Sequence, residues 1–332
     1  MLAELGVNHD GDVAVALRLI DAAADAGADG VKVQCFRPER LLAAGAGLAA
    51  YQRSSEADVV SMLARLALPA EVLPRLRERA HDRGLAFVAT PFSLEDVQDL
   101  EAAGLDAVKI ASPDVVNTPL LDAALGLGLP TLVSTGGASL DEVAPAAVWL
   151  HRHASETTPV ALLQCVSSYP TPDPDAALGG IGVLGETFRL PVGYSDHTTS
   201  VAMGGWAVAA GACVLEKHLT HDRGASGPDH AASLEAHDFA RYAEQAHAAA
   251  AALGPRAKHP LEREREVLAL CRQGLYATRD LSPGDTLSRE DVSIRRPAGE
   301  LPAAAIEQVL GRRVGHAVAS GTPLHAGLFA EA

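Results

Sequence analysis

The sequence has few aromatic residues and a deficit of positive charge. Aromatic side chains make up 4% of the 332 residues, so the core must be built mainly from aliphatic side chains. The chain has 27 Lys and Arg residues against 42 Asp and Glu residues, which leaves a net charge of −15. This charge excludes binding to nucleic acid or to an anionic membrane surface as the main activity. An anionic ligand therefore requires a local positive pocket.

Cysteines, targeting signals and long apolar runs are also scarce. The cysteines are Cys35, Cys165, Cys213 and Cys271. None of them forms a C-x-x-C pair, which favours reduced thiols over a disulfide framework or a zinc knuckle. The N-terminal segment MLAELGVNHDGD has an acidic residue and no basic stretch, so no signal peptide is expected. The uncharged stretches 123–140 and 198–215 are broken by Gly, Ser, Thr or Pro, which predicts buried elements rather than membrane spans. We therefore expect a cytoplasmic protein.

Short apolar runs alternate with helical patterns along most of the chain. Strands are predicted at residues 2–7, 30–36, 85–90, 107–111, 131–135, 160–166, 192–195 and 212–219. Helices are predicted between them, for example at 12–26, 70–82, 93–103, 118–127 and 140–153. Eight apolar strands that alternate with helices predict an α/β fold, a (β/α)8 TIM barrel over residues 1–253.

The pattern changes after the predicted barrel. Residues 254–266 contain two prolines and alternating charges, which indicates a linker. Residues 267–332 have short segments and the turn signals SPGD and RPAG, which predict a small β-rich domain. A domain of this size is marginally stable alone, so we expect it to pack on its own barrel or on that of a partner.

Polar residues stand at the end of every predicted barrel strand. In chain order they are Glu4, Asn8 and His9; Lys32 and Gln34; Thr90; Lys109 and Ser112; Ser134 and Thr135; Ser167 and Tyr169; Ser195, Asp196 and His197; and Lys217 and His218. The carboxyl ends of the strands form the active site of a TIM barrel, so these side chains are expected to converge. The pattern favours an enzyme over an inert scaffold.

Two histidines suggest a metal site. His197 and His218 end neighbouring strands, so their imidazoles are placed to share one divalent ion and leave positions open for water and substrate. The alternative is that each is a hydrogen-bonded residue of the barrel.

Two lysines suggest an anionic substrate. Lys32 and Lys109 lie inside otherwise apolar strands, where an ammonium group is costly unless an anion meets it. A phosphate or carboxylate of the substrate is the natural partner, and an internal ion pair with Glu4 or Asp196 is the alternative. A lysine cluster also fits an aldolase that forms a Schiff base with a keto acid, which predicts borohydride trapping and indifference to chelators.

Several motifs in order resemble the sialic acid synthase family, which includes the N-acetylneuraminate, legionaminic acid and pseudaminic acid synthases. They are AELGVNHDGD (3–12), GADGVKVQCF (27–36), ATPFS (89–93), VKIAS (108–112), VSTGGAS (133–139), CVSSYPTP (165–172), GYSDHT (193–198), and LEKHLT followed by GPDH (227–230). LYATRDLSPGD and IRRPAGE resemble the family's C-terminal antifreeze-like (SAF-type) domain. The resemblance runs nearly end to end.

The resemblance implies a reaction. The family condenses phosphoenolpyruvate with an N-acetylated amino sugar, such as N-acetylmannosamine or a related 6-deoxy diacetamido sugar. The products are a nine-carbon 2-keto-3-deoxy acid and phosphate, and the cofactor is a divalent metal such as Mn2+ or Mg2+. The family also forms a domain-swapped homodimer.

The resemblance also implies roles for individual residues. His197 and His218 match the metal ligands, and Glu4 matches an acidic residue that orients or deprotonates water. Phosphoenolpyruvate is expected to bind Lys32, Thr90, Lys109, Ser112, Ser134 and Ser195. The sugar is expected to bind Gln34, Asp114, Tyr169, Asp229 and, from the antifreeze-like domain of the partner copy, Arg296.

The chain departs from the family on the sugar side. Pro113 and Asp114 stand where the family usually has glycine and glutamate, and Asn is common in the family near Ser167. Ala298 is an extra residue in the arginine motif. The reaction type is therefore predicted more firmly than the acceptor sugar.

Overall fold

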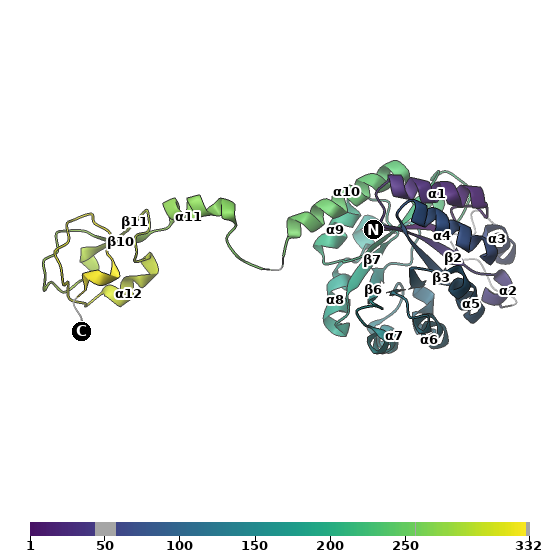
Figure 1. The fold of residues 1–332 in the computed structure, drawn as a ribbon, viewed down its shortest axis with the longest axis horizontal. Coiled ribbons are helices and arrows are strands. Elements are labelled where there is room, and N and C mark those ends of the chain that lie inside the picture. The colour runs from purple at the N-terminus through teal and green to yellow at the C-terminus, as the bar shows by residue number, and fades with distance from the viewer. Residues whose placement is uncertain (44–57, 256, 330–332) are drawn as a thin grey trace. The chain divides into compact units, whose positions relative to one another are not determined.

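The computed structural model describes residues 1–43, 58–255 and 257–329. The chain divides into two compact units, Met1–Gly254 and Pro255–Ala332 (Figure 1). Each unit has its own apolar core.

The first unit is a closed barrel of eight parallel strands. They are β1 (Leu2–Gly6), β2 (Gly30–Cys35), β3 (Ala86–Pro91), β4 (Ala107–Ile110), β5 (Thr131–Ser134), β6 (Val160–Cys165), β7 (Val192–Asp196) and β8 (Leu215–Thr220). Each strand pairs with the next, and β1 pairs with β8 to close the barrel. The short strand β9 (Leu234–Glu235) pairs with the end of β8. The predicted barrel is confirmed, although its last strand begins at Leu215 rather than at residue 212.

Helices surround the barrel (Figure 1). They are α1 (Val13–Asp25), α2 (Pro38–Leu41), α3 (Val59–Leu66), α4 (Leu73–Asp82), α5 (Leu94–Ala103), α6 (Thr118–Gly126), α7 (Leu140–His153), α8 (Gly179–Phe188), α9 (Met203–Ala209) and α10 (Ala236–Leu253). None of the helices in the described ranges combines the length and apolar character needed to cross a bilayer.

Local sequence signals set where these helices begin and end. The Asp12 side chain accepts hydrogen bonds from the first backbone N–H groups of α1. Ser139 and Glu142 form a reciprocal capping box at the start of α7. Gly104 ends α5 with φ 73°, a left-handed conformation that glycine adopts without steric cost.

Alternation along the strands divides the barrel into two faces. In β2, Val31 and Val33 belong to the apolar layer under the helices, whereas Lys32 and Gln34 line the cavity inside the barrel. The aliphatic layer therefore holds the helices, and the alternate positions are free to carry polar groups.

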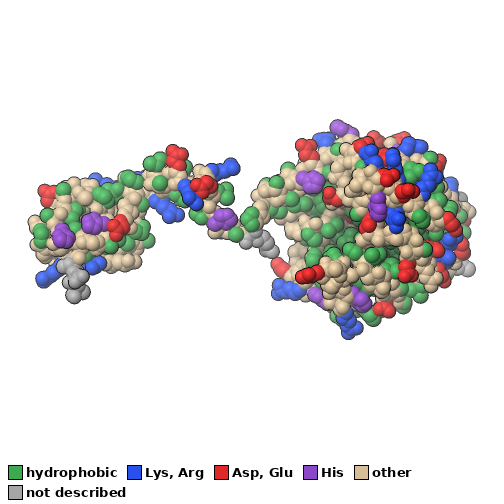
Figure 2. Space-filling view, in the orientation of Figure 1, with side chains coloured by type: hydrophobic (Ala, Val, Ile, Leu, Met, Phe, Trp, Pro, Cys, Tyr) green, Lys and Arg blue, Asp and Glu red, His purple; other side chains and the backbone are tan. Residues whose placement is uncertain are grey.

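The outer surface carries charges of both signs. Figure 2 shows red and blue side chains lying close together over α1 and α4. Among them, Arg79 contacts Asp21 at 2.7 Å, and Arg83 contacts Asp25. Ion pairs of this exposed kind contribute little to stability, at about 0 to 1 kcal/mol each.

The second unit is small and rich in β structure. Its antiparallel strands are β10 (Gly274–Ala277) and β11 (Val292–Arg295), and its helices are α11 (Arg265–Cys271) and α12 (Ile306–Val309). Its core contains Leu275, Leu287, Val314 and Leu324, all 2% exposed or less. The predicted linker, 254–266, includes the start of α11.

Candidate active site

A cavity of about 480 Å³ lies inside the barrel at the carboxyl ends of its strands. It is lined by twelve of the fourteen predicted site residues: Glu4, Lys32, Gln34, Thr90, Lys109, Ser112, Ser134, Tyr169, Ser195, His197, His218 and Asp229. The strand ends therefore bring together residues that lie more than 200 positions apart in the sequence, as the barrel topology requires.

Four buried charged groups form the floor of this cavity. The Lys32 Nζ lies 3.3 Å from Glu4 Oε2 and 3.0 Å from Glu216 Oε1. The Lys109 Nζ lies 3.7 Å from the other Glu216 oxygen. All four side chains are less than 10% exposed. The internal ion pair considered as an alternative for Lys32 is thus present with Glu4, and the same lysine also faces the cavity.

Burial and neighbouring charges shift the pKa values of Glu216 and Glu4 in opposite directions. Burial opposes ionisation of Glu216, but the charges of Lys109 and Lys32 outweigh it and lower the pKa of Glu216. Burial raises the pKa of Glu4 to about 7, against the opposing charge of Lys32. Glu216 is therefore the stable anion, and Glu4 can gain or lose a proton near neutral pH.

The pKa values of Lys32 and Lys109 are also shifted in opposite directions. Burial opposes the charge of Lys32, but Glu216 and Glu4 together raise its pKa. Burial lowers the pKa of Lys109 to about 8, although Glu216 opposes the shift. Lys109 also donates a hydrogen bond to the backbone oxygen of Ile110 at 3.1 Å.

Hydroxyl groups surround the lysines, and two of them are unpaired. Ser195 donates to Glu216 at 3.0 Å, and Ser112 accepts from the backbone N–H of Gly136 at 3.0 Å. Thr90 and Ser134 are at most 2% exposed, and neither hydroxyl has a hydrogen-bond partner within the described residues. A buried hydroxyl without a partner is costly, so these two point to a ligand that accepts hydrogen bonds.

His197 and His218 fit a divalent metal ion. Their ring centroids lie 5.3 Å apart, and both imidazoles line the cavity. The Nδ1 of His197 lies 2.7 Å from the backbone oxygen of Val166, the type of contact that orients a metal-binding histidine. Burial lowers the pKa of His218 well below its ordinary value, and its buried Nδ1 has no hydrogen-bond partner among the described residues. A neutral imidazole with an unused nitrogen is the form that binds metal.

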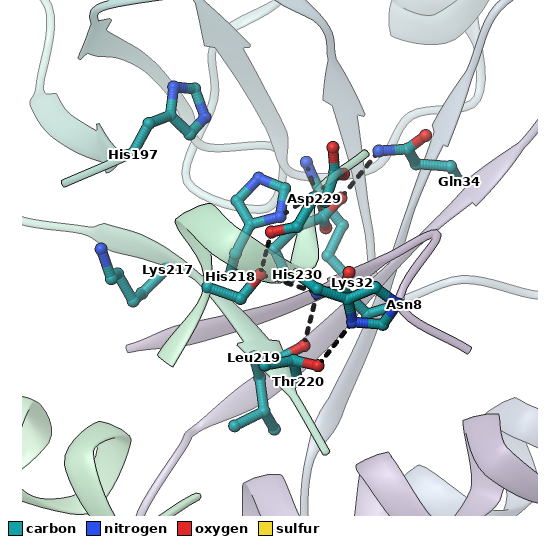
Figure 3. Close-up of polar contacts among 12 residues, drawn as sticks. Asn8, Lys32, Gln34, His197, Lys217, His218, Leu219, Thr220, Asp229 and His230 are labelled. Carbon is teal, nitrogen blue, oxygen red and sulfur yellow. Dashed lines mark hydrogen bonds and ion pairs between the residues drawn. The ribbon is translucent and has the colours of Figure 1, made fainter. Parts of the chain in front are cut away.

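The predicted sugar-side residues contact the two histidines and Glu4. The centroids of the Tyr169 and His197 rings lie 4.1 Å apart with the rings tilted by 34°, and Gln34 donates to Glu4 at 3.1 Å. The Asp229 Oδ2 lies 3.7 Å from His218 Nδ1, as Figure 3 shows. Gly6 is needed here, because a Cβ atom at this position would lie 3.1 Å from Glu4 and 3.2 Å from Asp229.

A hydrogen-bonded frame holds the Asp229 loop (Figure 3). Asn8 donates to the Leu219 oxygen at 2.9 Å and to Ser233 at 2.7 Å. Ser233 in turn donates to the Asp229 backbone oxygen at 2.7 Å. Asn8, expected with the converging side chains, therefore supports the site from behind.

Five of the strand-end residues do not line the cavity, so the expectation that they converge there is wrong: Asn8, His9, Thr135, Asp196 and Lys217. The last two form an ion pair. Both are fully buried on the outer face of the barrel wall, where Lys217 Nζ lies 3.2 Å from Asp196 Oδ2. Successive side chains of a strand point to opposite faces, so neighbours of the inward His197 and His218 must point outward. Asp196 therefore pairs with Lys217, and not with Lys32 or Lys109.

Two predicted sugar-binding residues do not line the cavity. Asp114 accepts a hydrogen bond from Asn117 at 3.0 Å near the start of α6. Arg296 is an exposed residue of the second unit. Their roles stay predictions.

The cavity is also lined by residues that the sequence analysis did not predict. Glu216 stands two positions before His218 in β8, so the period of two could have placed it in the cavity. An apolar wall of Phe36, Met62, Leu66 and Phe92 also faces the cavity, and no sequence signal distinguishes it from ordinary core. Cys165 lies there too, 3.8 Å from His197 Nδ1.

A second group of metal-type ligands lies elsewhere. Cys35, Asp96 and Asp99 have ligand atoms within 4.8 Å of one another. The guanidinium of Arg40 contacts both carboxylates, at 2.9 Å and 3.0 Å. The Arg40 guanidinium already pairs with the two carboxylates of this cluster, so the histidine pair is the better metal site.

The fold and the cavity together define a (β/α)8-barrel enzyme whose cavity holds two buried lysines and a pair of histidines. The model of the NeuB family matches residues 19–258, and that of the SAF domain matches residues 272–330. The chain belongs to the NeuB family, which confirms the resemblance to sialic acid synthases and the prediction of an enzyme.

Relatives match over nearly the whole chain. An N,N'-diacetyllegionaminic acid synthase of Campylobacter jejuni is 36% identical over 315 residues, 94% of each chain. A protein of the same name from Legionella pneumophila is 35% identical over 98% of this chain and 92% of its own. The solved structure of an N-acetylneuraminic acid synthetase from Leptospira borgpetersenii has a TM-score of 0.73 at 34% identity, covering 80% of this chain and 89% of that one.

Glu4 gives a pH-dependent test of this charge arrangement. Because its pKa is raised from 4.5 to about 7, the folded protein holds a proton that the unfolded chain has lost between these pH values. Stability must then fall by about 3 kcal/mol as the pH rises through this window, and level off above it.

Urea unfolding of wild type and Glu4→Gln, without metal or phosphoenolpyruvate, isolates this effect. Between pH 4.5 and 7, the free energy of unfolding of wild type should fall relative to that of Glu4→Gln. A difference that stays constant across this range contradicts the protonation of Glu4.

Proposed function

We propose that this protein condenses phosphoenolpyruvate with an N-acetylated amino sugar to give a nine-carbon 2-keto-3-deoxy acid and inorganic phosphate. One observation carries the proposal. Two buried lysines, and two buried hydroxyls without a hydrogen-bond partner in the described ranges, lie in the same cavity as a pair of histidines. The lysines and hydroxyls suit a small, highly charged anion. The histidines suit a metal ion that activates an aldehyde as the electrophile.

The lysines and hydroxyls provide the anion site. Lys32 and Lys109 supply charge that Glu216 only partly balances, so the phosphate and carboxylate of phosphoenolpyruvate supply the missing anions. The hydroxyl groups of Thr90 and Ser134 have no hydrogen-bond partner in the part of the chain that the structure describes, and Ser112 and Ser195 line the same cavity.

His197 and His218 hold the metal ion in this proposal. When bound, a divalent ion such as Mn2+ or Mg2+ supplies Lewis-acid polarisation of the sugar aldehyde. The hydrogen bond from His197 to Val166 and the buried position of His218 keep both rings oriented toward the cavity.

The chemistry follows from this placement. Carbon 3 of phosphoenolpyruvate attacks the aldehyde carbon of the open-chain sugar, which forms the new C–C bond and leaves positive charge at carbon 2. The electron pair of the aldehyde π bond goes to its oxygen, which takes up a proton and becomes a hydroxyl group of the product. Water adds to carbon 2, and its proton passes to Glu4, whose pKa near 7 suits a general base. Phosphate then leaves by cleavage of its bond to carbon 2, and the new hydroxyl group at carbon 2 gives up its proton to form the keto group.

The relatives and the cavity wall favour a 6-deoxy diacetamido sugar over N-acetylmannosamine as the acceptor. Two of the relatives are named as synthases of N,N'-diacetyllegionaminic acid. Phe36, Met62 and Phe92 present an apolar wall to the cavity, which suits methyl groups better than hydroxyls. Gln34, Tyr169 and Asp229 supply the polar contacts in this proposal, together with Asp114.

Lys109 supports one alternative. Its pKa of about 8 is low for a lysine, as a Schiff-base aldolase requires. Such an aldolase releases no phosphate and does not need metal, so the assay below separates the two functions.

The test combines purified protein, phosphoenolpyruvate, Mn2+ and a panel of amino sugars, with and without chelator. We expect chelator-sensitive phosphate release and a product heavier than the sugar by the pyruvate unit. His218→Ala should abolish both without unfolding, whereas His247→Ala on the outer face of α10 should leave both unchanged. Metal-independent product without phosphate, or an active His218→Ala variant, contradicts the proposal.

The resemblance extends the proposal to a domain-swapped homodimer in which Arg296 binds the acetamido group of the sugar. Arg296→Ala should raise the KM for the sugar and leave the KM for phosphoenolpyruvate unchanged. Arg295→Ala, which removes the neighbouring exposed arginine, is the control. Equal sugar KM values for wild type and Arg296→Ala contradict this role.

A cytoplasmic location remains part of the proposal, because all four cysteines are free thiols.

A further inference from the structure

A fully buried ion pair lies behind the two histidines. Asp196 and Lys217 are both 0% exposed, and Lys217 Nζ lies 3.2 Å from Asp196 Oδ2. The two residues are register partners in the adjacent strands β7 and β8. In the described part of the chain, the other ion pairs with both side chains below 10% exposure lie between residues that line the cavity. This pair is on the opposite face of the barrel wall.

Each member of the pair precedes one of the histidines. Asp196 is followed by His197, and Lys217 is followed by His218. Because side chains alternate along a strand, the pair faces the helices while the histidines face the cavity. Figure 3 shows Lys217 and His218 leaving β8 in different directions. The pair thus joins the two strand ends immediately behind the imidazoles.

Lys217 also holds the backbone on both sides of His197. Its Nζ donates to the Thr198 backbone oxygen and to that of Asp196, the latter at 3.4 Å. Asp196 Oδ1 accepts from the Thr198 backbone N–H at 2.8 Å. The residues before and after His197 are therefore tied to β8 through one ammonium group.

The surrounding helices prevent this pair from moving toward water. The ring of Tyr242, on α10, lies 5.6 Å from Lys217 Nζ and is 0% exposed. Gly204, on α9, lies so close to this ring that a Cβ atom there would approach it within 2.7 Å. The pair is therefore fully buried between the barrel wall and these helices.

Stability alone does not explain such a pair, because desolvation of two charges offsets much of their attraction. Its position explains it better. We propose that Asp196 and Lys217 are positioning residues that fix the separation of His197 and His218 and thereby set the affinity for the divalent ion. This inference rests on the proposed function, since it requires that the histidines bind metal.

The test measures Mn2+ binding to the metal-free protein by calorimetry and by the Mn2+ electron paramagnetic resonance signal. The double variant Asp196→Asn/Lys217→Met removes both charges at nearly constant volume, so the fold is expected to survive. We expect its Mn2+ dissociation constant to rise about 10- to 100-fold, as for other residues that orient metal ligands. Phosphoenolpyruvate binding in chelator depends on Lys32 and Lys109, and should not change.

Arg77→Met is the matched control. Arg77 donates to the backbone oxygens of Ala103 and Gly104, which precede β4 at the opposite end of the barrel. The Arg77→Met substitution also removes a cation that binds backbone carbonyl groups, but the Mn2+ affinity of this variant should equal that of wild type. If the double variant does not fold, Asp196→Asn alone keeps Lys217 on its two carbonyls and should weaken Mn2+ binding less.

The outcomes separate the two proposals. Wild-type Mn2+ affinity in a folded variant overturns the positioning role and leaves the proposed function intact. Parallel loss of Mn2+ and phosphoenolpyruvate binding also overturns it, because a merely structural role would weaken both. A wild-type protein that binds no Mn2+ overturns the metal site itself and the inference with it.

Discussion

The barrel interior depends on one carboxylate shared by two buried ammonium groups. Glu216 contacts both Lys32 and Lys109, and its pKa is lowered by them. Glu4, the other carboxyl group on Lys32, has a pKa near 7 and is only partly ionised at neutral pH. Negative charge beside the two lysines therefore only partly balances their positive charge, although the whole chain carries −15. A small anion stabilises this arrangement, because it pairs with ammonium groups that are already desolvated.

The same wall of the barrel serves two purposes. Its inward residues form a polar cavity, and its outward residues form an aliphatic layer under the helices. The outward layer is interrupted by Asp196 and Lys217, at the strand ends that carry His197 and His218. A rigid scaffold behind a set of functional side chains keeps their geometry without relying on loops. The two lysines, on β2 and β4, and the two histidines, at the ends of β7 and β8, are thus held by one closed sheet.

Much of this could be predicted from the sequence. Apolar runs gave the eight strands, and barrel topology then required their polar ends to meet, which placed Lys32, Lys109, His197 and His218 in one cavity. At LEKHLT, the alternation of side chains puts Glu216 and His218 on the inner face and Lys217 on the outer face, so the expectation that Lys217 lies in the cavity conflicts with the period of two. Charge partners are harder to predict. Which carboxyl group balances which lysine depends on distances across the barrel that no local pattern specifies, and the unpaired hydroxyls of Thr90 and Ser134 are visible only once their surroundings are known.

The measurement that tests the central claim most directly follows the bridging oxygen of phosphoenolpyruvate, labelled with oxygen-18. The claim is that phosphate leaves from carbon 2 after the new C–C bond has formed and water has added. This predicts that the label appears in the released phosphate, where the phosphorus resonance reports it. Unlabelled phosphate means that the bond to phosphorus is broken instead, and contradicts the account.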